Sequence, residues 1–113
     1  MAVIFNKVVI IGMGLIGASI ARSIRRGGLS NMIVGSDCSP SVAKEVARLQ
    51  ITDLFEPDAA VAVKSADLVV MAVPVGVVGT LAEQIIPNMK EGALLTDTGS
   101  TKKSVLRDVA PHL

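Results

Sequence analysis

Three glycines follow a short β-branched run near the start of the chain, and they constrain the fold more than any other feature. The run covers residues 8–11, and consecutive β-branched residues are typical of a strand that is buried on both faces. Gly12, Gly14 and Gly17 come next, and apolar residues then recur at helical spacing over residues 15–24. The pattern predicts a strand, a tight glycine turn and a helix.

At a strand-to-helix turn, this glycine spacing is typical of dinucleotide-binding proteins. Gly12 would allow the tight turn, Gly14 would let the backbone approach a pyrophosphate, and Gly17 would let the helix pack closely on the strand. The free amides of the first helical turn, at the positive end of the helix dipole, would hold the phosphates. We therefore expect cofactor contacts along the whole turn, which consists of Gly12, Met13, Gly14, Leu15, Ile16 and Gly17.

Asp37 is the second informative residue. It comes 20 positions after Gly17, directly after a short strand predicted at residues 32–35. A carboxylate at this place accepts hydrogen bonds from the adenosine ribose and repels a 2′-phosphate, and no basic residue follows before Lys44. These features favour NAD over NADP. The alternative is that Asp37 only caps the helix predicted from Pro40, and the two roles are compatible.

The rest of the chain alternates predicted strands and helices. Besides those above, we expect strands at residues 51–55, 68–74 and 93–96, and helices at residues 15–26, 40–49, 59–64, 77–86 and 100–110. Ser39 or Ser41 is expected to cap the helix at 40–49. The alternation predicts an α/β fold, a Rossmann-like doubly wound parallel sheet of five to six strands, in one domain over residues 1–113.

The strand predicted at residues 68–74 is continuously apolar, so we place it at the centre of the sheet. Pro74 cannot donate a hydrogen bond to a neighbouring strand and is expected to end it. Ligands of open parallel sheets bind beyond the carboxyl ends of the strands. We therefore expect Ala72, Val73 and Pro74 to lie alongside the nicotinamide half of the cofactor, although a proline that simply ends a strand explains Pro74 alone.

Composition excludes several other classes. The net charge is +1, which favours neither nucleic acid nor a membrane surface as partner, and no metal site is expected. Cys38 is the single cysteine, so no internal disulfide can form, and we expect it only to border the adenine site. The longest uncharged run, residues 68–82, is too short to span a bilayer, and no signal peptide is recognisable. A cytoplasmic location is the default expectation.

Three motifs together resemble the prephenate/arogenate dehydrogenase family. They are G-x-G-L-I-G-x-S at residues 12–19, D-L-V-V-M-A-V-P-V at 67–75 and D-T-G-S-T-K at 97–102. The resemblance spans almost the whole chain but covers only the N-terminal nucleotide-binding domain of that family. It implies an NAD(P)-dependent oxidative decarboxylation, which converts prephenate to 4-hydroxyphenylpyruvate or arogenate to tyrosine.

The resemblance also implies roles for individual residues. Ser100 matches the family serine at the active site, near the nicotinamide and the substrate hydroxyl, whereas Asp97 and Lys102 are expected to be architectural. The family's catalytic histidine, in a G-H-P segment, and its helical substrate and dimerisation domain are expected beyond this chain, and His112 does not match that histidine. The 113 residues should then bind cofactor without catalysing, as part of a homodimeric enzyme.

Two alternatives remain open from the residues. The chain could be the cofactor domain of a β-hydroxyacid dehydrogenase or of an imine or pyrroline-carboxylate reductase, which share the glycine turn and the apolar strand ending in Pro74. It could also be a nucleotide-sensing module without chemistry of its own.

Overall fold

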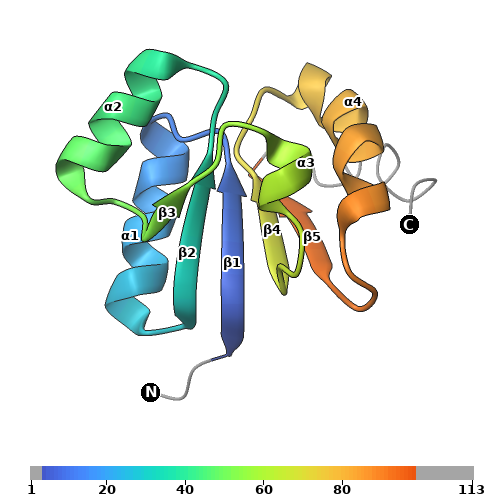
Figure 1. Ribbon diagram of the computed structural model, residues 1–113, viewed down its shortest axis with the longest axis horizontal. Coiled ribbons are helices and arrows are strands. Elements are labelled where there is room, and N and C mark those ends of the chain that lie inside the picture. The colour runs from blue at the N-terminus through green and yellow to red at the C-terminus, as the bar shows by residue number, and fades with distance from the viewer. Residues whose placement is uncertain (1–3, 99–113) are drawn as a thin grey trace.

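The computed structural model describes residues 4–98, which form one parallel sheet of five strands with helices on both faces (Figure 1). The strand order is β3-β2-β1-β4-β5, so the predicted doubly wound α/β fold is confirmed. The strands are β1 (Phe5–Ile11), β2 (Ser30–Ser36), β3 (Leu54–Phe55), β4 (Leu68–Met71) and β5 (Leu94–Asp97). The helices are α1 (Leu15–Gly27), α2 (Pro40–Leu49), α3 (Ala59–Ala62), α4 (Val75–Ile85) and the short 3-10 helix η1 (Ile86–Asn88).

β1 occupies the centre of the sheet. It pairs with β2 up to Ile11↔Ser36 and with β4 up to Ile11↔Met71, so the carboxyl ends of the three strands lie at one level. The chain first builds the sheet outward through β2 and β3, then returns to the other side of β1 with β4. The strand order therefore reverses next to β1, which is where open α/β sheets bind ligands.

Alternate residues of the sheet fill two aliphatic cores. One core lies under α3 and α4 and includes Val9, Val69 and Met71, and the other lies under α1 and α2 and includes Val8 and Ile10. All five side chains are fully buried. Each such burial contributes about 1.5–3 kcal/mol, and the residues on both faces of β1 explain why its sequence is continuously apolar.

Local signals set the helix bounds. α1 ends at Gly27, and its C-cap Gly28 has a left-handed φ of 62° and donates its amide to the carbonyl of Arg25. Ser39 caps α2, because its hydroxyl accepts the amide of Val42 at 3.4 Å, and Pro40 occupies the first helical position. Of the two candidate serines, Ser39 is therefore the cap, and the bounds of α2 are those predicted.

Several predicted bounds are wrong. β1, β2 and α4 begin two or three residues earlier than predicted, at Phe5, Ser30 and Val75, and bounds of β4, β3 and α3 also differ. β4 ends at Met71, where pairing with β5 stops, and Pro74 is instead the N-cap of α4. β3 has only two residues, because the carboxylate of Asp53 accepts the amide of Ile33 at 2.8 Å just before the strand begins. α3 stops at Ala62, and Ser65 follows with a positive φ of 60°. The helix predicted at residues 100–110 lies outside the described residues.

Within residues 4–98, no helix has the length and apolar character needed to cross a bilayer.

Candidate nucleotide-binding site

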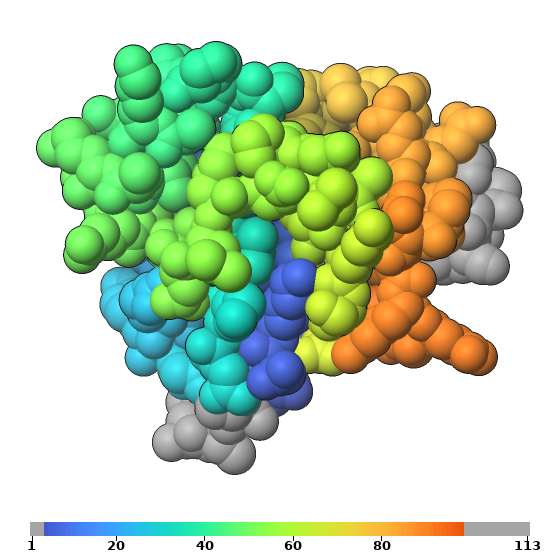
Figure 2. Space-filling model, in the orientation of Figure 1, coloured from blue at the N-terminus to red at the C-terminus, as the bar shows by residue number. Residues whose placement is uncertain are grey.

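A cavity of about 370 Å³ opens at the carboxyl ends of β1 and β2 and the segment after β4. Figure 2 shows the segment that follows β2 beside the segment that follows β4 along the upper edge of the molecule. The cavity combines the start of the glycine turn, the end of β2 and one face of α4. It is lined by Ile11, Gly12, Ser36, Asp37, Cys38, Pro57, Asp58, Ala59, Val73, Val77, Leu81 and Gln84. Its position is the one at which the fold predicts a ligand.

Two glycines of the turn are required by the protein's own packing. Gly12 has a φ of +91°, and a Cβ there would lie 2.4 Å from the carbonyl oxygen of Ala72. A Cβ on Gly17 would lie 2.0 Å from the carbonyl oxygen of Gly12. Both distances are far below van der Waals contact, so any larger residue would push α1 or β4 away from the turn.

Gly14 differs from its two neighbours, because a Cβ there would meet nothing within 4 Å. Its φ of −71° is open to any residue, and no side chain caps α1. Leu15 and Ile16, which follow in the first turn, are 91% and 60% exposed. The first turn of α1 is therefore exposed and its amides have no side-chain cap within the described residues, which suits the close approach of an anionic ligand.

Met13 belongs to the turn through its backbone alone. Its side chain is 3% exposed and packs in the core under α1 and α2, where a Cβ on Gly35 would lie 3.1 Å from the Met13 Cγ. Its amide donates to Oδ2 of Asp37 at 2.8 Å. Met13 thus anchors the turn and links it to Asp37, and its side chain does not line the cavity.

Asp37 joins the glycine turn to the start of α2. Besides the amide of Met13 on Oδ2, it accepts the amide of Ser39 on Oδ1 at 2.9 Å. The helix cap itself is the Ser39 hydroxyl, so capping of α2 is not what Asp37 does. Each carboxylate oxygen has about two acceptor positions. One on each oxygen is left for a ligand, and among residues 4–98 no cation lies within ion-pair distance of Asp37.

The three residues expected near the nicotinamide lie together after β4. The amide of Ala72 donates to the carbonyl of Ile11 at 2.8 Å, and its own carbonyl packs against Gly12. Val73 lines the cavity, and Pro74 is exposed at the start of α4. The contacts bring this segment against the glycine turn. Ser100, the expected catalytic residue, lies outside the described residues.

The wall of the cavity that α4 forms was not predicted from the sequence. Val77, Leu81 and Gln84 project from α4 at a spacing of four and then three residues, which is one face of a helix. Ser36, at the end of β2, was also missed; it is 1% exposed, and its hydroxyl has no hydrogen-bond partner within the described residues. The helical stripe was visible in the sequence, but nothing there showed that it faces a ligand rather than the core.

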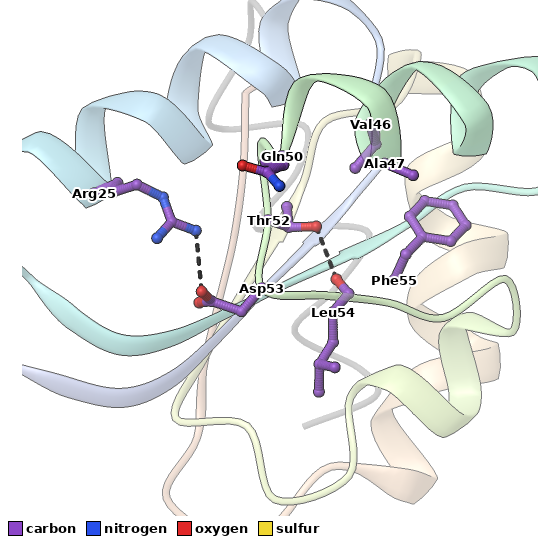
Figure 3. A pocket seen from close by; sticks show the side chains of 8 residues that line it. All are labelled: Arg25, Val46, Ala47, Gln50, Thr52, Asp53, Leu54 and Phe55. Carbon is purple, nitrogen blue, oxygen red and sulfur yellow. Dashed lines mark hydrogen bonds and ion pairs between the residues drawn. The ribbon is translucent and has the colours of Figure 1, made fainter.

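Another cavity, of about 470 Å³, lies at the edge strand β3 between α1 and α2 (Figure 3). Several of its polar groups are paired: Arg25 pairs with Asp53 at 3.3 Å, and the Thr52 hydroxyl donates to the carbonyl of Leu54 at 2.8 Å. Arg25 lies in the last turn of α1, far along the helix from the glycine turn. Residues 4–98 contain no group of three or more metal-ligating side chains suited to an ion.

A family model described as "Prephenate dehydrogenase, nucleotide-binding domain" matches residues 20–113. The match covers most of the chain and begins just after the glycine turn, so the turn is evidence independent of it.

Individual relatives agree with this match. The chain is 34% identical to the cyclohexadienyl dehydrogenase of Zymomonas mobilis, over 97% of this chain and 38% of that protein. It is 37% identical to the prephenate dehydrogenase of Lactococcus lactis, over 89% of this chain and 28% of that protein. A solved prephenate dehydrogenase from Aquifex aeolicus, in complex with hydroxyphenyl propionate and NAD+, superposes with a TM-score of 0.86 at 31% identity, over 96% of this chain and 38% of that one.

The chain thus spans 28–38% of the length of these relatives. Three findings agree on one domain of such proteins, the nucleotide-binding domain. They are the fold, the glycine turn with the Asp37 carboxylate bonded to it, and the family match. This chain belongs to the prephenate dehydrogenase family and corresponds to its nucleotide-binding domain.

Proposed function

We propose that this chain binds NAD, in preference to NADP, in the cavity at the glycine turn. The observation that carries the proposal is the position of Asp37, whose carboxylate is held beside the turn by the amide of Met13 at 2.8 Å and keeps acceptor positions free. A carboxylate there, without a cation beside it, accepts hydrogen bonds from the ribose hydroxyls and repels a 2′-phosphate. The NAD+ found in the Aquifex relative supports the same cofactor.

In this proposal, each part of the site takes one part of the cofactor. The amides of Leu15 and Ile16 would hold the pyrophosphate, because that end of α1 is uncapped and open. The adenosine would lie in the cavity against Val77 and Leu81. The nicotinamide half would extend past residues 72–74, where the β4 segment packs against Gly12.

We further propose that the protein containing this chain is an NAD-dependent dehydrogenase that oxidatively decarboxylates prephenate or arogenate. Bound NAD would supply the hydride acceptor, at nicotinamide C4; the hydride would leave the ring carbon that bears the hydroxyl as carbon dioxide departs and the ring becomes aromatic. The relatives' names and the motif at residues 97–102 support this proposal.

The role of this chain in that reaction would be to bind and orient. The glycine turn and Asp37 would fix the cofactor, and Ser100 would act at the substrate hydroxyl. Because the chain covers 28–38% of its curated relatives, we propose that the proton acceptor, the substrate-holding cations and the dimer contacts belong to the remainder of such proteins. The 113 residues alone should bind cofactor without turning over prephenate.

NADH fluorescence is the direct test of cofactor binding. The chain contains no Trp or Tyr, so its own fluorescence does not overlap the signal. We expect saturable enhancement with NADH and much weaker binding of NADPH. Asp37→Ala should weaken NADH binding about 10- to 100-fold and reduce discrimination against NADPH, because hydrogen bonds to a charged group contribute about 1.5–3 kcal/mol.

Glu45→Ala is the matched control, since it also removes one carboxylate but lies on the exposed side of α2, paired with Arg48. Equal affinity of the Asp37→Ala and Glu45→Ala variants for both cofactors would remove Asp37 from the site. A protein that contains this chain, binds NADH and yet forms no NADH from NAD with prephenate or arogenate would contradict the proposed reaction while leaving cofactor binding intact.

A further inference from the structure

Cys38 lies on the wall of the proposed cofactor cavity. It is the single cysteine of the chain, it is exposed, and it lines the cavity together with Gly12 and Asp37. The neighbouring residues on both sides are fixed, because Asp37 accepts the amide of Ser39 at 2.9 Å and Ser39 caps α2. The thiol therefore sits at a defined place on the rim of the cavity rather than on a free loop.

A second observation is a buried hydroxyl on the lining of this cavity, without a partner in the described part of the chain. Ser36 lines it from the end of β2, is 1% exposed, and has a hydroxyl without a hydrogen-bond partner among residues 4–98. Ser36 lies on the same face of β2 as Val34, which packs in the core under α3 and α4, and this is the side on which α4 walls the cavity. A buried hydroxyl is costly to leave unpaired, so a ligand that reaches the floor of the cavity would satisfy it.

We propose that Cys38 is a modification site at which a low-molecular-weight disulfide closes the cofactor cavity. The inference rests on the proposed function, because it assumes that the cofactor occupies the cavity that the thiol borders. An adduct on Cys38 would compete with the adenosine for the space between Asp37 and α4. Cofactor occupancy would in turn shield the thiol, since linked sites affect each other equally.

The reaction is a thiol–disulfide exchange. The Cys38 thiolate attacks one sulfur of the disulfide, that S–S bond breaks, and a new S–S bond forms between Cys38 and the attacked sulfur. The other sulfur leaves as a thiolate and takes up the proton that Cys38 lost. A reducing thiol reverses the exchange, so the closed state is temporary.

The experiment uses the whole chain and oxidised glutathione as the probe. NADH affinity is first measured on untreated chain, then on chain carrying one glutathione per molecule by intact mass, and again after reduction. We expect at least tenfold weaker binding after modification, full recovery on reduction, and at least fivefold slower modification when NADH is saturating. Unchanged far-UV circular dichroism would show that the adduct does not unfold the chain.

Adducts of different size test whether Cys38 modification weakens NADH binding by filling the cavity. A methylthio group, added with methyl methanethiosulfonate, should weaken NADH binding less than the glutathionyl group does, because it fills less of the cavity. Cys38→Ser should show the same NADH affinity before and after treatment with either reagent, which ties the effect to this thiol.

The outcomes separate the two proposals. If untreated chain fails to bind NADH, the proposed function itself fails. If untreated chain binds NADH but the glutathionylated chain binds it equally well, or NADH does not slow modification, Cys38 does not control the cavity and the inference is overturned.

Discussion

Asp67 and Asp37 lie at opposite ends of the sheet and use their carboxylates in different ways. Asp67 precedes β4 and accepts the amides of Asn6 and Lys7 at 2.8 and 2.9 Å, and its other oxygen pairs with the ammonium of Lys90. Asp37 follows β2 and also accepts two amides, but no cation pairs with it in the described part of the chain. The charge of Asp67 is neutralised by an ammonium of the protein, whereas Asp37 has no cationic partner among residues 4–98 and lines a cavity.

The difference shows how to separate structural from ligand-binding groups in this fold. At the amino end of the sheet, Asp67 ties the starts of β1 and β4 to the loop before β5, so its charge is neutralised within the protein. At the carboxyl end, the charge of Asp37 is left uncompensated beside an uncapped helix end. A negative charge that the protein does not neutralise is one that a ligand can use.

Gly14→Ala and Gly17→Ala provide the largest test of this distinction. Gly17→Ala should destabilise the fold by about 3 kcal/mol, because its Cβ would lie 2.0 Å from the Gly12 carbonyl oxygen. Gly14→Ala should cost only about 1 kcal/mol, because its Cβ meets nothing and only the preference for glycine at the N-cap of α1 is lost, but it should weaken NADH binding at least tenfold. Urea unfolding and NADH titration measure the two effects. Full NADH affinity in Gly14→Ala would contradict binding of the pyrophosphate at the turn.

Asp67→Asn should produce the opposite pattern to Asp37→Asn. Asn keeps only one acceptor oxygen, so either the Lys90 ammonium or the two amides that share Oδ2 would face an NH2 group, and the melting temperature should fall. The folded variant should bind NADH as the parent does, because Asp67 lies at the far end of the sheet. Asp37→Asn should instead reduce NADH affinity, and it should lower the melting temperature less than Asp67→Asn does. Weaker NADH binding by folded Asp67→Asn would contradict a purely structural role for Asp67 at the amino end of the sheet.

The smallest expected effect is the pH dependence of stability. Hydrogen bonding from Lys90, and then from the amides of Lys7 and Asn6, lowers the pKa of Asp67 from 3.8 to about 2. A carboxyl with a depressed pKa stabilises the fold above its ordinary pKa and loses that contribution on protonation, so this part of the stability should disappear between about pH 4 and pH 2. Urea midpoints of the parent and of Asp67→Asn should therefore converge as the pH falls through this range. A constant difference between the two would show that the charge of Asp67 plays no part.

Hydrophobic periodicity and the positions of turn and capping residues were enough to predict the architecture. The β-branched residues of β1, the glycine turn and the bounds of α2 were all foreseen, because each depends on residues that are neighbours in sequence. The start of β3 and the end of β4 were not, since they depend on the Asp53 carboxylate and on where pairing with β5 stops. Those are contacts between distant segments, which local propensity does not contain.

The same division holds for the site. Spacing predicted the turn and Asp37, but the link between the amide of Met13 and Asp37, the buried Met13 side chain and the wall formed by α4 became visible only in three dimensions. Ser36 could not be identified from its residue type, because a serine at the end of a strand is ordinary and only its burial without a partner is informative.

The central position of β1 has a consequence for synthesis of the chain on the ribosome. Residues 5–11 are made before the other strands of the sheet and can pair with β2 once residue 36 has emerged, but the other edge of β1 has no partner until β4, at residues 68–71, is also available. During that interval the nascent chain carries an open apolar strand edge, which is the kind of surface that chaperones cover. The strand that organises the finished sheet is therefore also the one that must be protected longest while the sheet is being built.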